Sequence, residues 1–138
     1  MVSREELIRK GAIDPYSRYQ KQLSVSDIFP YRTDGRCACG CGTILIGRRT
    51  RWTDNVCRRN AYIYRCIIWG DIRVIRDQLL YRDKGVCAKC HITVEDPKGW
   101  QADHIIPVYK GGGGCTLKGY QTLCIECHKE KTVEDMAR

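Results

Sequence analysis

The stretch Gln101-Ala-Asp103-His104-Ile-Ile-Pro107 sets a carboxylate beside an imidazole at the end of an apolar, strand-like run that proline closes. A second stretch, Cys124-Ile-Glu-Cys127-His128-Lys-Glu-Lys, adds another imidazole directly after a cysteine pair. Carboxylates and imidazoles bind divalent cations, and an imidazole also accepts protons near neutral pH. The two stretches together predict a centre that combines a metal ion with proton transfer.

The composition indicates a small basic domain. A chain of 138 residues with 43% hydrophobic residues suits one modest core, and is neither disordered nor membrane-like. The formal charge of +8 is concentrated in residues 48–84, where ten Lys/Arg face four Asp/Glu. This surplus favours a polyanionic partner, although charge alone fits a solvated basic helix equally well. The candidate DNA-binding residues are Arg48, Arg49, Arg51, Arg58 and Arg59.

The ten cysteines bear on both compartment and cofactor. The start of the chain, Met1-Val-Ser-Arg-Glu-Glu6, is polar and lacks the apolar core of a signal peptide. We therefore expect a protein that is not secreted but works in a reducing compartment such as the cytoplasm, without a membrane partner. Under those conditions thiolates that hold zinc are favoured over disulfides.

Four cysteines form two Cys-x-x-Cys pairs separated by 33 residues, and we call them the downstream cluster: Cys87, Cys90, Cys124 and Cys127. Four thiolates satisfy a tetrahedral structural zinc and leave no open catalytic position. One alternative is ordinary buried cysteines. Another is haem attachment, because a histidine follows each pair, but an export signal is missing and six more cysteines would have no purpose.

The upstream cluster, Cys37, Cys39, Cys41 and Cys57, predicts a second zinc knuckle around a turn-like Gly42. Its spacing is tight, so a lost zinc site with free thiols stays an alternative. Between and around the clusters we expect a short helix from Ser3 to Gly11 and helical spacing from Asp54 to about Arg82, divided at Gly70-Asp71. A strand over 99–107, a flexible connection at 111–114 and a helix over 122–137 complete the expectation.

The chemistry expected of these residues is phosphodiester hydrolysis. That reaction needs a nucleophilic water and a cation that stabilises the charge developing on the phosphate. Asp103 and His128 can hold the cation. Strand alternation turns His104 away from Asp103, toward the attacking water, as candidate general base.

The chain resembles the HNH endonuclease family from Cys87 to Thr132, through Trp100-Gln-Ala-Asp-His-Ile-Ile-Pro-Val-Tyr-Lys-Gly-Gly-Gly-Gly114 and Tyr120-Gln-Thr-Leu-Cys124. Similar domains occur in a eukaryotic annealing helicase and in small free-standing phage and bacterial HNH proteins, so a phage or bacterial origin is expected. The resemblance implies a small α+β fold, in which a ββα-metal unit is stapled by a four-cysteine zinc site and preceded by helices and the second knuckle. It also implies Mg²⁺ or Mn²⁺ on Asp103 and His128, with His104 as the base.

One position departs from the family pattern. Where the family has an asparagine that orients the base histidine, this chain has Gly119. Glycine keeps a carbonyl that can accept from His104 but loses the side-chain amide. Two functions follow: a metal-dependent DNA endonuclease, or a zinc-stabilised nucleic-acid-binding module whose nuclease centre is weakened or inactive. The expected organisation is an N-terminal helical extension over 1–35, a knuckle and basic helical region over 36–84, and an HNH unit over 85–138.

Overall fold

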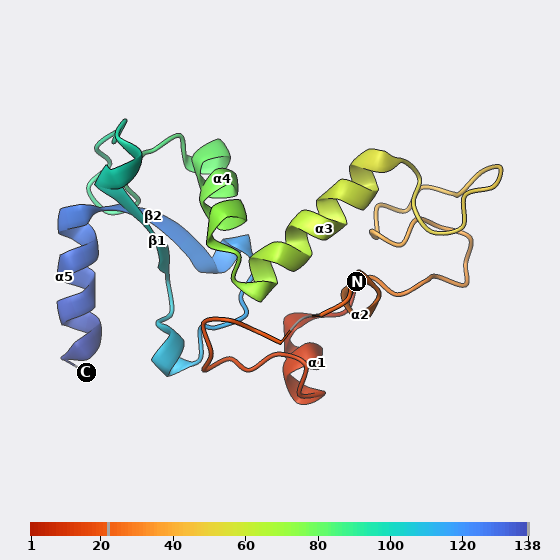
Figure 1. The fold of residues 1–138 in the computed structure, drawn as a ribbon, viewed down its shortest axis with the longest axis horizontal. Helices are drawn as coiled ribbons and strands as arrows, with labels where there is room; N and C mark the ends of the chain where they lie inside the picture. Colours follow the sequence, from red (N-terminus) through yellow and green to blue (C-terminus); the bar gives the residue numbers. More distant parts are fainter. Residues whose placement is uncertain (22, 138) are drawn as a thin grey trace.

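A computed structural model describes residues 1–21 and 23–137, and it has the predicted small α+β architecture (Figure 1). Its elements, in chain order, are α1 (Arg4–Arg9), α2 (Val25–Ile28), α3 (Asn55–Trp69), α4 (Ile72–Asp83), β1 (Trp100–His104), β2 (Tyr120–Cys124) and α5 (Ile125–Met136), with three short 3-10 turns at Pro97–Gly99, Val108–Lys110 and Leu117–Gly119.

The predicted helix boundaries are largely confirmed. Ser3 caps α1 by accepting a hydrogen bond from the Glu6 backbone, and Asp54 caps α3 in the same way through Cys57. Gly70 ends α3 in a left-handed conformation, and the Asp71 carboxylate then accepts from the first backbone amides of α4. A glycine followed by an aspartate therefore breaks one apolar pattern into two helices, as expected.

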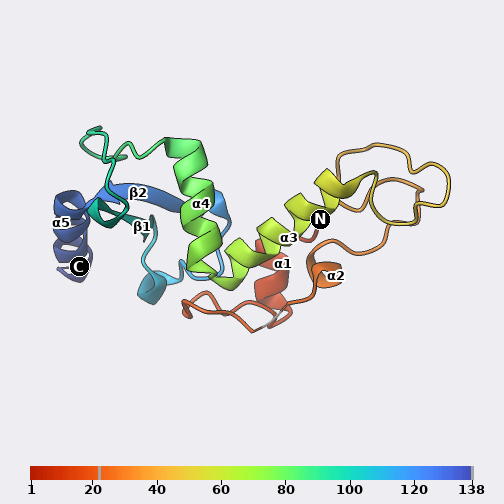
Figure 2. The same ribbon diagram turned by 45° about the horizontal axis from the view of Figure 1, so that its top comes forward.

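The sheet consists of β1 and β2, which pair antiparallel with Asp103 opposite Gln121 and His104 opposite Tyr120. Strand β1 ends at His104, three residues before the proline. The helix expected over 122–137 begins only at Ile125, since residues 122–124 belong to β2. Helices α4 and α5 lie on opposite sides of this pair of strands (Figures 1 and 2).

Two apolar cores meet on α3. The first joins the N-terminal residues to α3 through Leu7, Ile28, Phe29 and Ile68, among others. The second joins α3 and α4 to the sheet, and Trp100 is buried in it. Each core therefore contains residues from two of the three expected ranges, 1–35, 36–84 and 85–138. The division of the chain into these ranges stays a prediction.

Residues 111–114 are not the flexible connection that the glycine run suggests. Gly112, Gly113 and Gly114 are buried, and the Gly113 amide donates to the Pro15 carbonyl at 2.6 Å. A Cβ on Gly113 would lie 2.1 Å from the Ser17 carbonyl oxygen, so only glycine fits this approach. The N-terminal range thus packs directly against the loop that follows β1.

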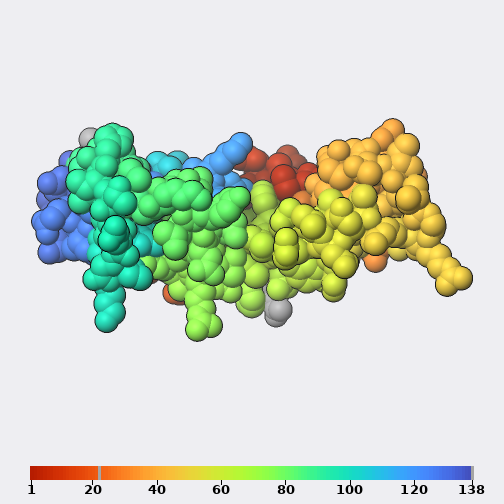
Figure 3. All heavy atoms as spheres, turned by 90° about the horizontal axis from the view of Figure 1, so that it is seen from above, coloured from red at the N-terminus to blue at the C-terminus, as the bar shows by residue number. Residues whose placement is uncertain are grey.

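Arg4 strengthens the same junction, because its guanidinium donates to the carbonyls of Gly111 and Gly113 at 3.0 and 2.6 Å. The molecule is elongated, with the ββα unit at one end and the segment before α3 at the other (Figure 3). Within the described residues, no helix is long and apolar enough to cross a membrane.

Candidate metal centres

The downstream cluster assembles as its spacing predicts. One sulfur from each of its four cysteines lies within 4.8 Å of all the others. Cys124 is the N-cap of α5 and Cys127 lies in the first turn, where the helix dipole favours thiolates. Against this, hydrogen bonding to Cys124 and then burial raise the pKa of Cys127 to about 12, so a bound cation is needed to hold the four thiolates together. Four crowded sulfurs of this kind fit a tetrahedral zinc.

The upstream cluster also assembles, with its four sulfurs within 4.8 Å of one another. Cys37 is buried, and its sulfur accepts a hydrogen bond from the Thr53 backbone amide at 3.3 Å. The four cysteines come from the Arg36–Ile44 bridge region and the first turn of α3. A second zinc fits this arrangement as well, and the metal's identity stays a prediction.

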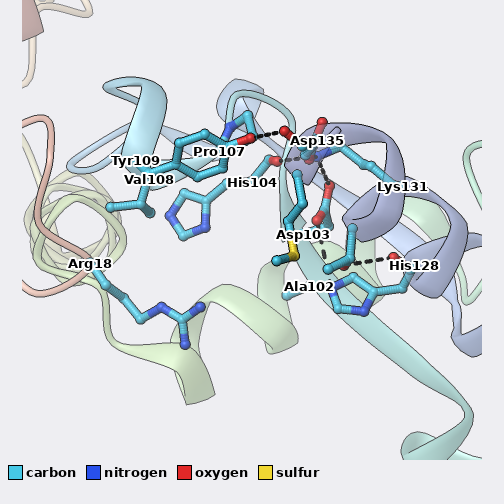
Figure 4. Close-up of a pocket in the computed structure, with 12 residues that line it drawn as sticks. Arg18, Ala102, Asp103, His104, Pro107, Val108, Tyr109, His128, Lys131 and Asp135 are labelled. Carbon is cyan, nitrogen blue, oxygen red and sulfur yellow. Dashed lines mark hydrogen bonds and ion pairs between the residues drawn. The ribbon is translucent and has the colours of Figure 1, made fainter. Parts of the chain in front are cut away.

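Asp103, His104 and His128 converge on one pocket of about 370 Å³, which Gly119 does not line (Figure 4). It is lined by β1, by the turn after it and by α5. His128 Nε2 lies 3.7 Å from Asp103 Oδ1. Two ligand atoms about 2.1 Å from a shared cation lie at most about 4.2 Å apart, so this pair fits one divalent ion.

The two oxygens of Asp103 face different partners. Oδ1 faces His128, while Oδ2 accepts from Gln121 Nε2 at 3.0 Å and lies 3.3 Å from Lys131 Nζ. The side chain of Asp103 is only 11% exposed, so these contacts fix its orientation. One carboxylate oxygen is thus held by protein donors and the other stays available to a cation.

Lys131 was not singled out by the sequence, yet it lies at the centre of the site. Its ammonium also donates to the His104 carbonyl at 3.1 Å and to Asp135 Oδ2 at 2.6 Å. Burial lowers the pKa of Lys131, but Asp135 and Asp103 outweigh burial and raise it. Its spacing of three residues from His128 on one helix face was the signal that could have identified it.

His104 lies on the other side of the strand from the Asp103 carboxylate, with its ring facing the pocket (Figure 4). The imidazole packs against the Tyr120 ring, with centroids 4.5 Å apart. Burial lowers its pKa, and Arg18 lowers it further. Among the described residues, its buried Nε2 has no hydrogen-bond partner. A neutral imidazole with a free nitrogen suits a general base.

Gly119 makes no hydrogen bond with the His104 imidazole. Its carbonyl accepts instead from the Ile105 backbone amide at 2.9 Å. A Cβ at this position would lie 2.6 Å from Cys115 Cβ and 2.7 Å from Cys115 Sγ. The thiol of Cys115 therefore occupies the space into which a larger residue at 119 would project.

Arg18 is the second residue that sequence reasoning missed. It belongs to the range 1–35 and reaches the pocket from the side opposite α5, with its guanidinium across from His104 (Figure 4). No pattern around Arg18 distinguishes it from any surface arginine. Only the packing of Pro15 and Ser17 against the glycine loop brings it there.

The predicted DNA-binding arginines do not line this pocket. Arg48, Arg49, Arg58 and Arg59 are exposed on the loop before α3 and on its first turns. Arg51 is instead engaged within the protein, donating to the Phe29 carbonyl and stacking over two aromatic rings.

Residues 87–134 match the model of the HNH endonuclease family. Over 35 residues, a quarter of the chain, the sequence is 63% identical to the DNA annealing helicase and endonuclease ZRANB3 of Mus musculus. It is 67% identical to the Homo sapiens protein over 33 residues. Each match spans about 3% of the relative's length. No solved structure matches the chain. The segment that resembles the HNH endonuclease family, residues 87–134, is thus the one that supplies β1, β2, most of α5 and the downstream cluster.

Proposed function

We propose that this protein is a metal-dependent endonuclease that hydrolyses phosphodiester bonds of DNA. The observation that carries the proposal is the pocket in which Asp103 and His128 converge beside the unpaired imidazole of His104. The match of residues 87–134 to the HNH endonuclease family supports hydrolysis, and the relatives' name, DNA annealing helicase and endonuclease, supports DNA as the substrate.

His104 is the general base. Its neutral ring takes a proton from a water whose oxygen attacks phosphorus, and the bond from phosphorus to the leaving oxygen breaks. The leaving oxygen then takes a proton from solvent. Mg²⁺ or Mn²⁺ held by Asp103 and His128 would supply stabilisation of the charge that develops on the phosphate and the leaving oxygen.

Protein cations complete the site. Arg18 reaches the pocket from the side facing His104, where its guanidinium binds a non-bridging phosphate oxygen. Lys131 holds Asp103 and the His104 backbone together, so it fixes the relative positions of cation ligand and base. Lys131 is therefore a positioning residue, since its ammonium is already engaged by two carboxylates.

Two zinc ions in the cysteine clusters have a structural role in this proposal. The downstream zinc would fix the start of α5, and hence His128, against the segment of Cys87 and Cys90 that precedes β1. Among the described residues, each cluster offers four sulfurs and no further His, Asp or Glu ligand. The catalytic role thus belongs to Asp103 and His128.

The test is cleavage of supercoiled plasmid by the purified full chain with added Mg²⁺ or Mn²⁺, and without either. Nicked or linear products should appear only with the added ion, and His104→Ala should abolish them. His91→Asn is the matched control, because His91 is an exposed histidine outside the pocket and asparagine tolerates its positive φ of 65°. Equal cleavage by wild type and His104→Ala would refute the assignment.

A second candidate rests on Gly119, which leaves the His104 ring without a hydrogen-bonded brace. The protein would then be a zinc-stabilised nucleic-acid-binding module with a weakened or inactive nuclease centre. Loss of such support commonly lowers activity about 10- to 100-fold. Salt-sensitive DNA binding without ion-dependent cleavage in the plasmid assay would favour this candidate.

A further inference from the structure

The candidate site continues into a second hollow on the far side of His104. This hollow of about 310 Å³ is lined by His104 and His128 together with Arg18, Tyr19, Gly70 and Ile72. A third hollow of about 350 Å³ shares Tyr19, Gly70 and Ile72, and adds Trp69. The shared residues make the two hollows neighbours, so one groove runs from the candidate centre to the end of α3.

The walls of this groove are aromatic and apolar around Tyr19, Trp69 and Ile72, polar where His104 and His128 line it, and open to solvent. The side chains of Tyr19 and Ile72 are 66% and 49% exposed. One carboxylate, that of Asp71, belongs to the groove, but it accepts hydrogen bonds from the first amides of α4. The groove therefore offers flat apolar faces with a cation, Arg18, at the end near the centre.

From Trp69, aromatic rings paired with cationic side chains continue along one face of α3. The Arg65 guanidinium lies 5.6 Å from the Trp69 ring centroid and 5.7 Å from that of Tyr62, while Arg58 lies 5.4 Å from Tyr62. Positions 58, 62, 65 and 69 are spaced by four, three and four residues, which places them on one helix face. Cations and rings thus alternate in an unbroken row.

This row extends the groove away from the centre. The 11 steps from position 58 to position 69 span about 17 Å at about 1.5 Å of rise each. At about 3.4 Å per stacked nucleotide this accommodates about five nucleotides of one strand. Figure 3 shows α3 and α4 forming the surface between the ββα unit and the segment that precedes α3.

We propose that the groove and the cation-aromatic face of α3 bind an unpaired strand of DNA that continues from the cleaved phosphate. Alternating rings and guanidinium groups suit unpaired bases, because a base can displace a guanidinium from the ring that it covers and stack there, while the released cation contacts the phosphate. Paired bases in a duplex have no free faces for such stacking. The inference rests on the proposed nuclease function, since the groove begins at the candidate centre.

The test is a binding assay kept separate from cleavage. Fluorescence anisotropy of a labelled single strand and of its duplex is measured with the full chain carrying His104→Ala. Two further substitutions on α3 are chosen for exposure: Tyr62→Ala, and Arg58→Gln, whose guanidinium contacts only Tyr62 among the described residues. The matched pair, at the end of α4, is Tyr81→Ala on the helix and Lys84→Gln at its C-cap, since this exposed tyrosine also carries a cation 4.6 Å from its ring but lies outside the groove.

We expect Tyr62→Ala to weaken binding of the single strand about 10-fold, as for the loss of one stacked base. Arg58→Gln should reduce the salt slope by about 0.7, as for one lost phosphate contact on a single strand. Both α4 substitutions should change affinity less than about twofold. A single strand with abasic sites should bind the parent protein as weakly as Tyr62→Ala binds the normal strand.

Equal losses for Tyr62→Ala and Tyr81→Ala would overturn the inference, as would tighter binding of the duplex with the same dependence on Tyr62. Retained affinity for the abasic strand would also overturn it, because stacking would then contribute nothing. A protein that binds single strands through Tyr62 but never cuts would refute the proposed nuclease function and leave the binding surface intact.

Discussion

Gly119→Ala tests the fit between the loop and the residue that replaces the family's asparagine. The substitution adds one methyl group, whose carbon would lie 2.6 Å from Cys115 Cβ and 2.7 Å from its Sγ. Ordinary carbon contacts begin at 3.4 Å, so about 0.8 Å of movement is required. Cys115 is buried against Tyr120 and other core residues and has little room to move.

The expected cost is that of overpacking a core, about 1–3 kcal/mol of unfolding free energy. For a chain of this length about 1 kcal/mol shifts the melting temperature by about 3–4 °C, so a fall of about 3–12 °C is expected. Thermal unfolding is followed by the fluorescence of the tryptophans, of which Trp100 is buried. Zinc is kept in constant excess, because ligand concentration shifts apparent stability.

The control is the background Cys115→Gly, which removes both clashing atoms. In that background Gly119→Ala should cost less than about 0.5 kcal/mol, and the difference between the two costs is the interaction energy of the pair. Equal costs in both backgrounds would refute the steric reasoning. By the same reasoning, Gly119→Asn alone should not raise cleavage activity, whereas Gly119→Asn with Cys115→Gly has space for the amide beside His104.

Three further outcomes are expected. The full chain should bind two zinc ions, and Cys127→Ser should lower this to one and reduce the melting temperature; two ions per variant chain, measured by mass spectrometry of the metal, would contradict this. Arg18→Gln should move the acidic limb of the pH–rate profile of cleavage to higher pH, because Arg18 lowers the pKa of His104 and only the unprotonated ring accepts a proton. An acidic limb at the same pH in both proteins would contradict this. Arg76→Ala should lower the free energy of unfolding in urea by about 2 kcal/mol. The Arg76 guanidinium lies 3.8 Å from the Trp100 ring centroid and donates to the Trp100 carbonyl at the start of β1. Arg76→Lys should recover only part of this loss.

Local patterns predicted those features whose physics is local. A capping serine, a glycine followed by an aspartate, and two Cys-x-x-Cys pairs identified α1, the break between α3 and α4, and the downstream cluster before any tertiary contact was considered. The start of α5 was placed three residues early, because β-pairing of 122–124 with β1 overrides their helical spacing.

Long-range packing decided the rest of the site. Asp103, His104 and His128 were predictable as candidates because their chemistry is visible in two short motifs. Arg18 was not, because it reaches the pocket only through the backbone contact of Gly113 with Pro15, 98 residues away in the sequence. The glycine run is ordered for the same reason, since buried backbone amides need partners.

The sequence by itself determined the ββα unit, its cysteine clusters and the residue types at the candidate centre, because spacing along one strand or one helix fixes which side chains share a face. Only the tertiary structure decided how Asp103 divides its two oxygens, why Gly119 must stay small beside Cys115, and how an aromatic groove extends from the centre onto α3. These features depend on distances between segments far apart in the chain, which no local pattern specifies.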